Sequence, residues 1–441
     1  MTRALFSTLL VVGASLLASP NGLVAAEPKA AVDKPNIIFI LADDLGLDGV
    51  GCCGSDTYKK QTPNIDALAR TGTRFEACYA SAMCGPSRCL LLTGRYAFRT
   101  GGLGNLSWRP GGPGPKSKDE YPIARLLKEN GYATCQTGKW RQVGETPKDW
   151  GFDEYCTDDT PSGWYWQKSY IKNGRTVNTD KEVYCPDIMH DFVIDFINRH
   201  KDRPFFVYYA SHLVHLPMER TPDSKPGTTD RKTLYADNLA YLDKQVGLIV
   251  KELERLHLRE KTLIVFSADN GTQGPRQGPR GQNPNFATTV NGRALSGHKA
   301  QMLEGGSRVP LIANWPGVTP PGRALKDLVD FSDMYPTFAA IAGAKMPKDL
   351  PFDGQSYAPQ LRGQTGKPRE WVYVQLGNRW YVRSPGWKLT HSGDLFDMKD
   401  APFVEKPVAA DSTDADARAA REKLQKVLDA LNPAGGKVDK P

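Results

Sequence analysis

The sequence predicts an α/β protein in which helices sandwich a mostly parallel central sheet, with a small antiparallel sheet subdomain at the C-terminal end. Several short apolar runs are typical of strands that are buried on both faces, as they are in parallel sheets. Between these runs, apolar residues recur at helical spacing, and after Pro351 the chain alternates and turns as antiparallel strands do. The three runs that predict buried strands are residues 35–41, 204–210 and 263–266.

Length and composition favour a large soluble protein. The chain has 441 residues, of which 40% are hydrophobic and 24% are charged, and these are ordinary values for a globular chain. We expect a signal peptide at residues 1–26, an α/β domain at 27–350 and a C-terminal subdomain at 351–441. That subdomain should hold the small antiparallel sheet and end with a helix at 415–431.

The charge balance gives a weak indication of the partners. The formal net charge is +8 and the sequence pI is about 8.9. A positive excess attracts anionic substrates, although it also suits an ordinary solvated surface. Because the chain has no run rich in Lys and Arg, we expect no nucleic-acid partner.

The N-terminus has the pattern of a secretory signal peptide. Arg3 supplies the positive start, residues 9–17 the apolar core, and the small residues 24–26 a cleavage site. An uncleaved membrane anchor is the alternative, but the apolar run is short for a span. No later stretch is long and apolar enough to cross a membrane, so we expect an exported protein, periplasmic or secreted, without a span after cleavage.

Polar residues follow the first and third apolar runs. Asp43 and Asp44 come after the first run, and Asp269 and Asn270 follow the third. In open α/β sheets, ligands bind just beyond the carboxyl ends of strands. Four oxygen-bearing side chains there would form a cage for a hard divalent cation, calcium or magnesium. A turn with a helix cap is the alternative for Asp43 and Asp44.

A helix with Ile65 and Leu68 on one face should begin at Pro63. The segment Cys84-Gly85-Pro86-Ser87-Arg88 follows later in the chain. Pro86 suits the first position of the next helix, which places Cys84 just before the helix N-terminus. Arg88, about one turn on, can point back at the same place. A thiol, a positive helix end and a guanidinium favour an anion site. The alternative is a buried cysteine beside a structural arginine.

The middle of the chain is harder to interpret. A helix that ends near Gly131 and a short strand lead to Lys139, which alone would be taken for a surface charge. Residues 140–185 appear irregular and hold many aromatic residues, which either stack on a sugar or aryl group or pack a satellite core. Two histidines, His212 and His215, follow the second apolar run.

The remaining elements alternate in the same way. A long amphipathic helix should cover residues 239–256, and the stretch 272–298 is long for a loop, so it is expected to be functional or mobile. Lys299 and Glu304-Gly305-Gly306 follow this stretch, then a strand at 309–313. Ser332 should cap a helix that ends at Gly343.

Eight cysteines in an exported chain suggest disulfides. A bridge between Cys156 and Cys185 is possible, but the connectivity cannot be deduced from the spacing.

The segment from Cys84 to Arg88, followed by Leu-Thr-Gly-Arg at 92–95, resembles the signature of the formylglycine-dependent type I sulfatases, which are arylsulfatase-like enzymes of the alkaline phosphatase superfamily. Further matches occur in family order along the chain. They are Asp43-Asp44, Gly138-Lys139-Trp140, His215-Leu216-Pro217, Asp269-Asn270-Gly271, Lys299 with Glu304-Gly305-Gly306, and 394–397.

The resemblance implies specific roles for these residues. Cys84 would be oxidised to formylglycine by a formylglycine-generating enzyme, which leaves seven cysteines and at least one unpaired. Position 84 would share one divalent cation, Ca²⁺ in preference to Mg²⁺, with Asp43, Asp44, Asp269 and Asn270. The catalytic set would be Cys84, Arg88, Lys139, His215 and Lys299, of which the last three also bind the sulfate.

These expectations define an exported sulfatase that acts on a sulfated small molecule or glycan, with a sulfated carbohydrate favoured by export, charge and aromatic content. Two alternatives stay open. One is a phosphate or phosphonate ester hydrolase on the same scaffold, since both substrates are tetrahedral oxyanions. The other is an inactive binder of sulfated glycans, against which the complete residue set argues.

One position departs from the family pattern. Two residues after the lysine of Gly-Lys-Trp, sulfatases usually have a histidine that is thought to remove a proton for sulfate release, and this chain has Arg141. A guanidinium cannot act as that base, but it can bind two anionic oxygens. We therefore expect Arg141 to bind substrate, unless it turns to the surface.

Overall fold

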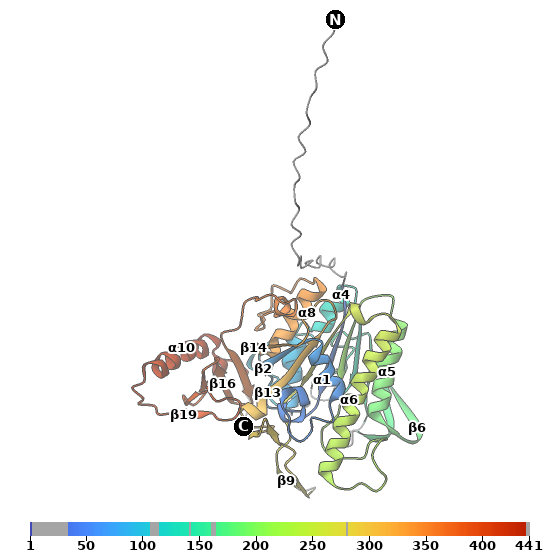
Figure 1. Cartoon of the computed structure of the whole chain (residues 1–441), viewed down its shortest axis with the longest axis horizontal. Helices are drawn as coiled ribbons and strands as arrows, with labels where there is room; N and C mark the ends of the chain where they lie inside the picture. The colour runs from blue at the N-terminus through green and yellow to red at the C-terminus, as the bar shows by residue number, and fades with distance from the viewer. Residues whose placement is uncertain (2–33, 106–113, 141–142, 160–164, 279–280, 438–441) are drawn as a thin grey trace. The chain divides into compact units, whose positions relative to one another are not determined.

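The computed structural model describes Met1 and residues 34–105, 114–140, 143–159, 165–278 and 281–437. A ten-stranded sheet runs through the part from residue 34 onwards, with helices on both faces, and a second sheet of five strands lies towards the C-terminus (Figure 1). The predicted fold class is therefore confirmed. The expected signal peptide at 1–26 lies outside the described residues, Met1 apart. No helix in the described ranges is both long and apolar enough for a membrane span.

The centre of the large sheet is parallel, and the predicted buried runs supply its innermost strands. Strand β1 lies between β8 and β7, which both run parallel to it, and β3 and β4 continue in the same direction. Every residue of β1, β7 and β8 is buried. Their bounds are β1 (Asn36–Ala42), β3 (Ala133–Gly138), β4 (Glu154–Asp158), β7 (Phe205–Ala210) and β8 (Thr262–Ala268).

The outer strands of the sheet are mixed in direction. Strand β13 is antiparallel to both β8 and β2, and β14 is parallel to β2 at that edge. At the other edge, β5 and β6 form an antiparallel hairpin that continues from β4. The bounds are β2 (Thr73–Tyr79), β5 (Trp166–Lys172), β6 (Arg175–Tyr184), β13 (Arg308–Asn314) and β14 (Arg323–Asp330).

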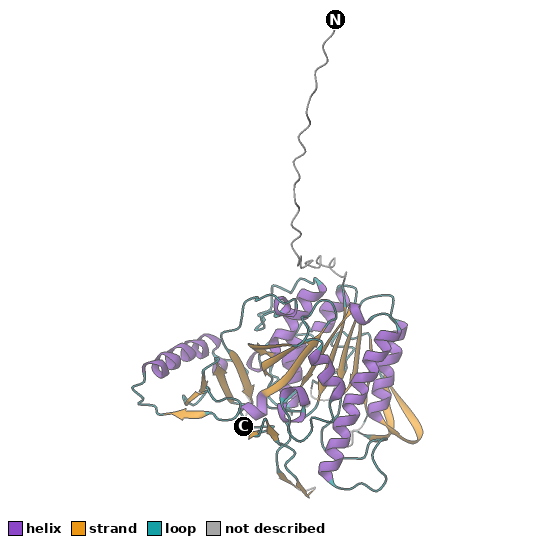
Figure 2. Ribbon diagram, viewed as in Figure 1, coloured by secondary structure: helices purple, strands orange, loops and turns teal. Residues whose placement is uncertain are grey.

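Two groups of helices cover the sheet (Figure 2). Helices α1 and α5 both contact α6, whereas α2 and α4 both contact α8. Strand β3 contacts α4 and α5, which places the two groups on opposite faces. The bounds are α1 (Pro63–Arg70), α2 (Cys84–Thr93), α3 (Ala97–Thr100), α4 (Ile123–Glu129), α5 (Cys185–Arg199), α6 (Arg231–Arg255), α7 (Glu304–Ser307) and α8 (Met334–Ala342).

The five-stranded sheet is antiparallel, as predicted, and runs in chain order from β15 to β19. Helix α10 contacts β16, β17 and β18 of this sheet and has the bounds expected from the sequence. Its elements are β15 (Val372–Leu376), β16 (Arg379–Arg383), β17 (Trp387–Thr390), β18 (Leu395–Asp397), β19 (Lys406–Val408) and α10 (Ala415–Leu431), with the short helix α9 (Ala358–Leu361) before it.

Three local predictions were wrong. The stretch 140–185 is not irregular, because its described residues form β4, β5 and β6. The stretch 272–298 is not a plain loop, since it contains two short hairpins, β9–β10 (Arg276–Gly278, Gly281–Asn283) and β11–β12 (Thr289–Val290, Arg293–Ala294). Ser332 does not cap the helix that ends at Gly343. Asp330 caps a short 3₁₀ turn there, with its carboxylate accepting from the Ser332 N–H at 2.9 Å.

The cysteines form no disulfide in the structure, and the aromatic residues of 140–185 follow one of the two roles considered for them. All eight cysteines are free thiols, so the bridge considered between Cys156 and Cys185 is not formed. Cys156 lies within β4, between β3 and β5, whereas Cys185 starts α5, and each thiol is buried. Most of the described aromatic residues of 140–185 pack a core, which was one of the two alternatives. Those buried there include Trp140, Trp150, Tyr165 and Tyr184.

Candidate active site

The carboxyl ends of β1 and β8 bring the predicted oxygen ligands together. Because Ala42 and Ala268 are register partners in the parallel pair, the residues that follow them lie side by side. The Asp44 N–H donates to Asp269 Oδ1 at 3.2 Å. Asp44 has a positive φ of 61°, which turns the chain out of the strand so that its carboxylate faces the same space as that of Asp43. These carboxylates are fully buried.

Asn270 supplies an acceptor with no partner. Its Nδ2 donates to Asp44 Oδ1 at 2.9 Å and to the Gly271 carbonyl at 3.0 Å. Its Oδ1 is buried and has no donor among the described residues. A buried acceptor is costly when it is left unpaired, so this oxygen beside the buried carboxylates fits a cation ligand.

Cys84 lies directly against the two aspartates of β1. Its Sγ is 3.4 Å from Asp43 Oδ1 and 3.9 Å from Asp44 Oδ1. Asp43, Asp44, Cys84 and His215 each offer one ligand atom, and these atoms lie within 4.8 Å of one another. The group could therefore bind a metal ion, with the hard oxygen donors suited to calcium or magnesium.

Helix α2 places Cys84 and Arg88 differently from the prediction. The helix begins at Cys84, not at Pro86, and Met83 is its N-cap. Cys84 is thus within the first turn, and Pro86 still falls where a missing N–H costs little. The Gly85 N–H of this turn is satisfied by Asn105 Oδ1 at 2.7 Å. The thiol therefore lies inside the first turn of the helix and not just before it.

Three buried cations surround the carboxylates. Arg88 donates to Asp269 Oδ2 through Nε at 3.0 Å and Nη2 at 2.7 Å, and its Nη1 bonds the Lys139 carbonyl at 3.2 Å. Lys139 Nζ contacts Asp43, and Lys299 Nζ donates to Asp44 Oδ2 at 2.7 Å. Opposite charges at these distances compensate part of the cost of burying each group.

The electrostatic effects on the pKa values follow from this arrangement. Burial, followed by the negative charges of Asp269 and Asp43, raises the pKa of the Cys84 thiol. Burial also tends to raise the pKa of Asp44, but Lys299, His215 and Lys139 outweigh it and hold that pKa below its usual range. Although burial lowers the pKa of Lys299, Asp44 reverses this and raises it overall. An unmodified thiol at position 84 is therefore protonated at neutral pH, and Asp44 and Lys299 are charged.

The two histidines after β7 have different surroundings. His215 Nε2 is 3.7 Å from Asp44 Oδ2, and burial, with Lys139 next, lowers its pKa. His212 Nε2 lies 3.0 Å from Asp158 Oδ1, in a fully buried pair outside the carboxylate cluster. The preference for His215 over His212 as the residue at the site therefore agrees with the geometry.

Sequence reasoning missed the residues that hold this segment. The Tyr165 hydroxyl donates to the His215 carbonyl at 2.6 Å, and Asp158 pairs with His212 from the end of β4. Asn105 was missed too. Each of these contacts joins positions far apart in the chain, so no local sequence pattern predicts it. Arg141, the one departure from the family pattern, lies outside the described residues.

The fold and the site together are those expected of a hydrolase for esters of a tetrahedral oxyanion. A candidate nucleophile at position 84, a group of side chains that could bind a metal ion and three cations meet at one end of a parallel sheet. The comparisons with known proteins specify which kind. The family model named Sulfatase matches residues 35–344, and the chain belongs to this family of sulfuric ester hydrolases. Membership implies a metal ion and a formylglycine.

The relatives agree with this assignment. Arylsulfatase A of Homo sapiens is 33% identical over 391 residues, which cover 81% of this chain and 72% of that protein. N-acetylgalactosamine-6-sulfatase of Canis lupus familiaris is 32% identical over 430 residues, covering 86% and 76%. Among solved structures, that of Ps i-CgsB is 29% identical with a TM-score of 0.76 and covers 90% of this chain and 92% of its own.

Proposed function

We propose that the protein is an exported sulfatase that hydrolyses sulfate esters of a sulfated carbohydrate, using a formylglycine made from Cys84 and one divalent cation. The observation that carries this proposal is the position of Cys84, whose thiol faces Asp43 and Asp44 inside a ring of buried cations. The carbohydrate is supported by one structural neighbour, Ps i-CgsB, which was also solved in complex with k-i-k-neocarrahexaose.

The chain offers a suitable set of residues for the cation. Asp43, Asp44 and the side chain at position 84, which belong to the clustered group described above, would hold it. The free acceptor of Asn270 and the carboxylate of Asp269, which lies beside Asp44, would complete the set. The positive charge of the cation and those of Lys139 and Lys299 would together attract the sulfate oxygens. All the protein donors except that of position 84 are oxygens, and we favour Ca²⁺ over Mg²⁺ because Ca²⁺ accepts several protein carboxylates more readily.

When formed, a hydrated formylglycine supplies one hydroxyl that attacks sulfur and a second whose deprotonation expels sulfate. The protein residues do the rest. The transition state spreads negative charge over the sulfuryl oxygens, and Lys139 and Lys299 bring fixed positive charge to them. Arg88, held by Asp269, steadies the side chain at position 84. Lys299, which stays protonated, protonates the leaving alcohol as the S–O bond breaks. His215, whose pKa burial lowers, suits the base that takes the proton of the second hydroxyl when sulfate leaves.

The first experiment tests the modification and the reaction together. The full chain is co-expressed with a formylglycine-generating enzyme, and the peptide containing residue 84 is analysed by mass spectrometry. We expect the thiol mass to be replaced by that of the aldehyde or its hydrate. Sulfate release should follow the modified fraction, and a preparation fully active with an intact thiol would refute the proposed nucleophile.

The second experiment tests the reaction class and substrate. Rates on 4-nitrophenyl sulfate and 4-nitrophenyl phosphate are compared, and sulfate release is then measured on a panel of sulfated galactans and glycosaminoglycan fragments. We expect the sulfate ester to be preferred and one carbohydrate class to stand out. Preference for the phosphate ester would favour the phosphate or phosphonate hydrolase instead.

Export is the remaining part of the proposal. It is supported by the positive start, apolar core and small-residue site of residues 1–26. N-terminal sequencing of protein recovered from the periplasm or the medium should begin near residue 27. Full-length protein retained in the cytoplasm would contradict it.

A further inference from the structure

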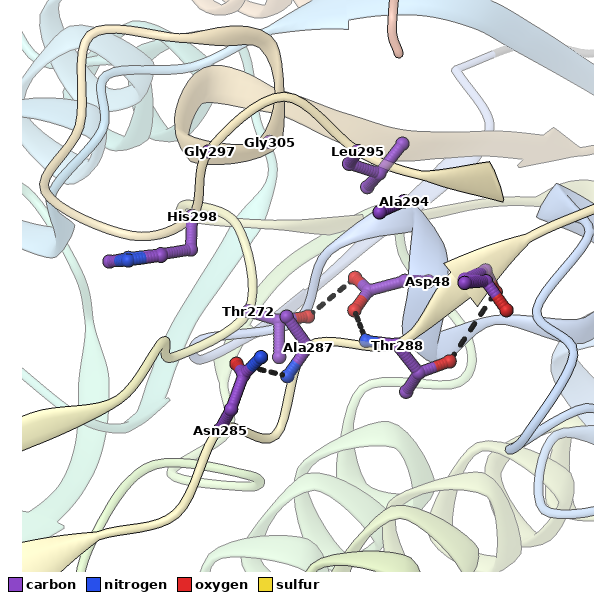
Figure 3. Close-up of a pocket in the computed structure, with 11 residues that line it drawn as sticks. Asp48, Thr272, Asn285, Ala287, Thr288, Ala294, Leu295, Gly297, His298 and Gly305 are labelled. Atoms are coloured by element: carbon purple, nitrogen blue, oxygen red, sulfur yellow. Dashed lines mark hydrogen bonds between the residues drawn. The ribbon is translucent and has the colours of Figure 1, made fainter. Parts of the chain in front are cut away.

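A cavity of about 280 Å³ lies beside the active site and is not used by the chemistry described above (Figure 3). Its walls come from three parts of the chain that are distant in sequence. Asp48 belongs to the short 3₁₀ turn after β1, and Thr272 follows the end of β8. Figure 3 shows the third wall, in which Asn285, Thr288, Ala294 and His298 line the same space.

The cavity is joined to the active site through Thr272. This residue is two positions after Asn270, and its carbonyl accepts from the Lys299 N–H at 3.1 Å. Its hydroxyl accepts from the Gly46 N–H at 2.9 Å and donates to Asp48 Oδ1 at 2.7 Å. The segments that carry the predicted metal ligands and the sulfate-binding lysine therefore continue directly into the walls of the cavity.

The third wall is fixed in place rather than loose. Hairpin β11–β12 turns at Asn291-Gly292, both with positive φ, which suits the two-residue turn of a tight hairpin. Asp56 holds the hairpin from outside, because its Oδ2 accepts from the Thr289 hydroxyl at 2.6 Å and the Gly292 N–H at 2.8 Å. A prebuilt wall lowers the entropy cost of binding a ligand there.

The chemistry of the lining suits sugar hydroxyls rather than a second anion. Polar residues such as Asn285 and Thr288 share the lining with apolar ones such as Ala294 and Leu295, as the hydroxyls and ring carbons of a sugar require, and no lysine or arginine is among the lining residues in the described part of the chain. The one carboxylate, Asp48, is already engaged, since Oδ1 accepts from Thr272 and Oδ2 from the Thr288 N–H at 2.8 Å. A sulfate or carboxylate would meet this negative charge without a cation to offset it.

We propose that this cavity is a subsite for one uncharged sugar residue, linked to the sulfated sugar that is bound at Lys139 and Lys299. His298 and Asn285 would bond its hydroxyls. The proposal rests on the proposed function, because the cavity adjoins that same site. Its volume is near the lower end of about 300–1,000 Å³ for small-molecule sites, which fits one ring and not a longer segment.

The test compares substrates with and without the second sugar. Hydrolysis of 4-nitrophenyl sulfate is measured beside that of two monosulfated disaccharides, neocarrabiose monosulfate and N-acetyllactosamine 6-sulfate. Ala294→Trp fills the cavity from an exposed strand position, and His298→Ala removes a polar wall. His391→Ala, an exposed histidine of the five-stranded sheet, is the matched control.

We expect both cavity variants to lower the ratio of kcat/KM for the better disaccharide to that for 4-nitrophenyl sulfate by about tenfold, or about 1.4 kcal/mol. The change should lie mainly in KM, and the control should keep the parent's ratio. An unchanged ratio in both variants, or an equal fall on both kinds of substrate, would overturn the proposal.

A second measurement separates this proposal from the proposed function. If the parent hydrolyses none of the three esters, the sulfatase assignment for these substrates fails, and the cavity is then tested by saturation-transfer NMR with unsulfated neocarrabiose and N-acetyllactosamine. Transfer to either sugar in the parent that is lost in Ala294→Trp supports the subsite. Transfer that persists in the variant, or none in the parent, refutes it.

Discussion

At the scale of single residues, the active site is a balance of buried charges. Asp269 has two functions in this balance, because it faces the predicted cation and also accepts two hydrogen bonds from Arg88. Removing it would leave Arg88 without its strongest partner and the cation one charge short. The site is therefore sensitive at this position to charge as well as to shape.

Asp269→Asn should lower the content of the bound divalent cation to less than a tenth of the parent's and turnover by at least about 100-fold, since the affinity of such a site depends on the number of carboxylates. Asp269→Ala should do the same and also destabilise the fold, because the buried guanidinium loses its acceptor. Elemental analysis and sulfate release measure the two effects. Asp223→Asn, at an exposed carboxylate that pairs with Lys244 outside the site, is the control. A metal content unchanged in Asp269→Asn would show the ligands to be misassigned.

Arg141 is predicted from the sequence alone to bind an anionic group of the substrate. Arg141→Ala should lower kcat/KM on a sulfated sugar that carries a carboxylate or second sulfate by about tenfold more than on 4-nitrophenyl sulfate, because only the former has a partner for the guanidinium. Paired kinetics on the two substrates measure this. Parent rates on both would leave Arg141 without a part in binding.

The prediction that the four oxygen-bearing side chains lie together was correct, because one rule applied to them. Asp43, Asp44, Asp269 and Asn270 could be brought together in advance because each follows a strand that is recognisable as buried, and parallel strands end at one edge. Asp158 could not be predicted as the partner of His212, because it ends a strand that the sequence does not make obvious.

At the scale of elements, the position of Lys139 depends on the end of β3. Gly138 has φ of 90°, and a Cβ there would lie 2.0 Å from the Ala210 carbonyl oxygen, which accepts from the Lys139 N–H at 2.8 Å. Gly131, before the same strand, has φ of 89° but no atom within 4 Å of a Cβ. The two positions therefore have the same positive φ, which would strain an alanine equally, and they differ in crowding.

Both Gly131→Ala and Gly138→Ala should lose about 1–2 kcal/mol of unfolding free energy from the positive φ. Gly138→Ala should lose more, since its methyl group must push β3 away from β7, and this should displace Lys139 and lower kcat at least tenfold. Urea unfolding and sulfate release compare them directly. Equal destabilisation and equal activity would mean that the contact at Ala210 relaxes freely.

The same scale shows why some elements escaped prediction. The central strands are continuous apolar runs, whereas β6 is largely exposed and polar at the sheet edge, so neither period nor hydrophobicity distinguishes it from a loop. The hairpins within 272–298 are too short to have a hydrophobic pattern. The bonds that hold β11–β12 and the residue before it go to Asp56 and Asp48, far back in the chain.

At the scale of the whole molecule, Glu304 joins the two sheets. Its buried carboxylate accepts from the Tyr79 hydroxyl of β2 at 2.9 Å, from Arg308 Nη1 of β13 at 3.0 Å and from Arg383 Nε of β16 at 2.9 Å. One side chain therefore connects the large sheet to the C-terminal sheet. The predicted boundary at residue 350 stays a prediction, but a contact of this kind favours unfolding of both parts together.

Glu304→Gln should cost about 3–5 kcal/mol of unfolding free energy, because two buried guanidinium groups lose their counter-charge. Calorimetry measures the loss of stability, and spectroscopic probes in each sheet show whether both sheets unfold together. Glu370→Gln, which removes an exposed partner of Lys423, should shift the transition little. A Glu304→Gln protein as stable as the parent would show that the connection contributes nothing.

This contribution should depend on pH. Burial tends to raise the pKa of Glu304, but Arg383 and Arg308 outweigh it and lower that pKa below the ordinary 4.5. The folded state then binds fewer protons than the unfolded state, so the stabilisation is complete above about pH 4.5 and is lost as the pH falls through the lower folded value. The difference in stability between parent and Glu304→Gln should therefore shrink on acidification, and a constant difference would contradict this.

The segment between Gly271 and Gly306 has a consequence for the evolution of this chain. The Gly271 N–H donates to the Gly306 carbonyl at 3.0 Å, and a Cβ on Gly271 would lie 1.8 Å from the Gly305 carbonyl oxygen. The two ends of this segment therefore lie against each other, and the residues between them form a closed loop. Since lengthening such a closed loop costs little, insertions and deletions confined to 273–298 can change what is bound beside the sulfate, while Lys299 and Glu304, which follow this stretch, stay in place.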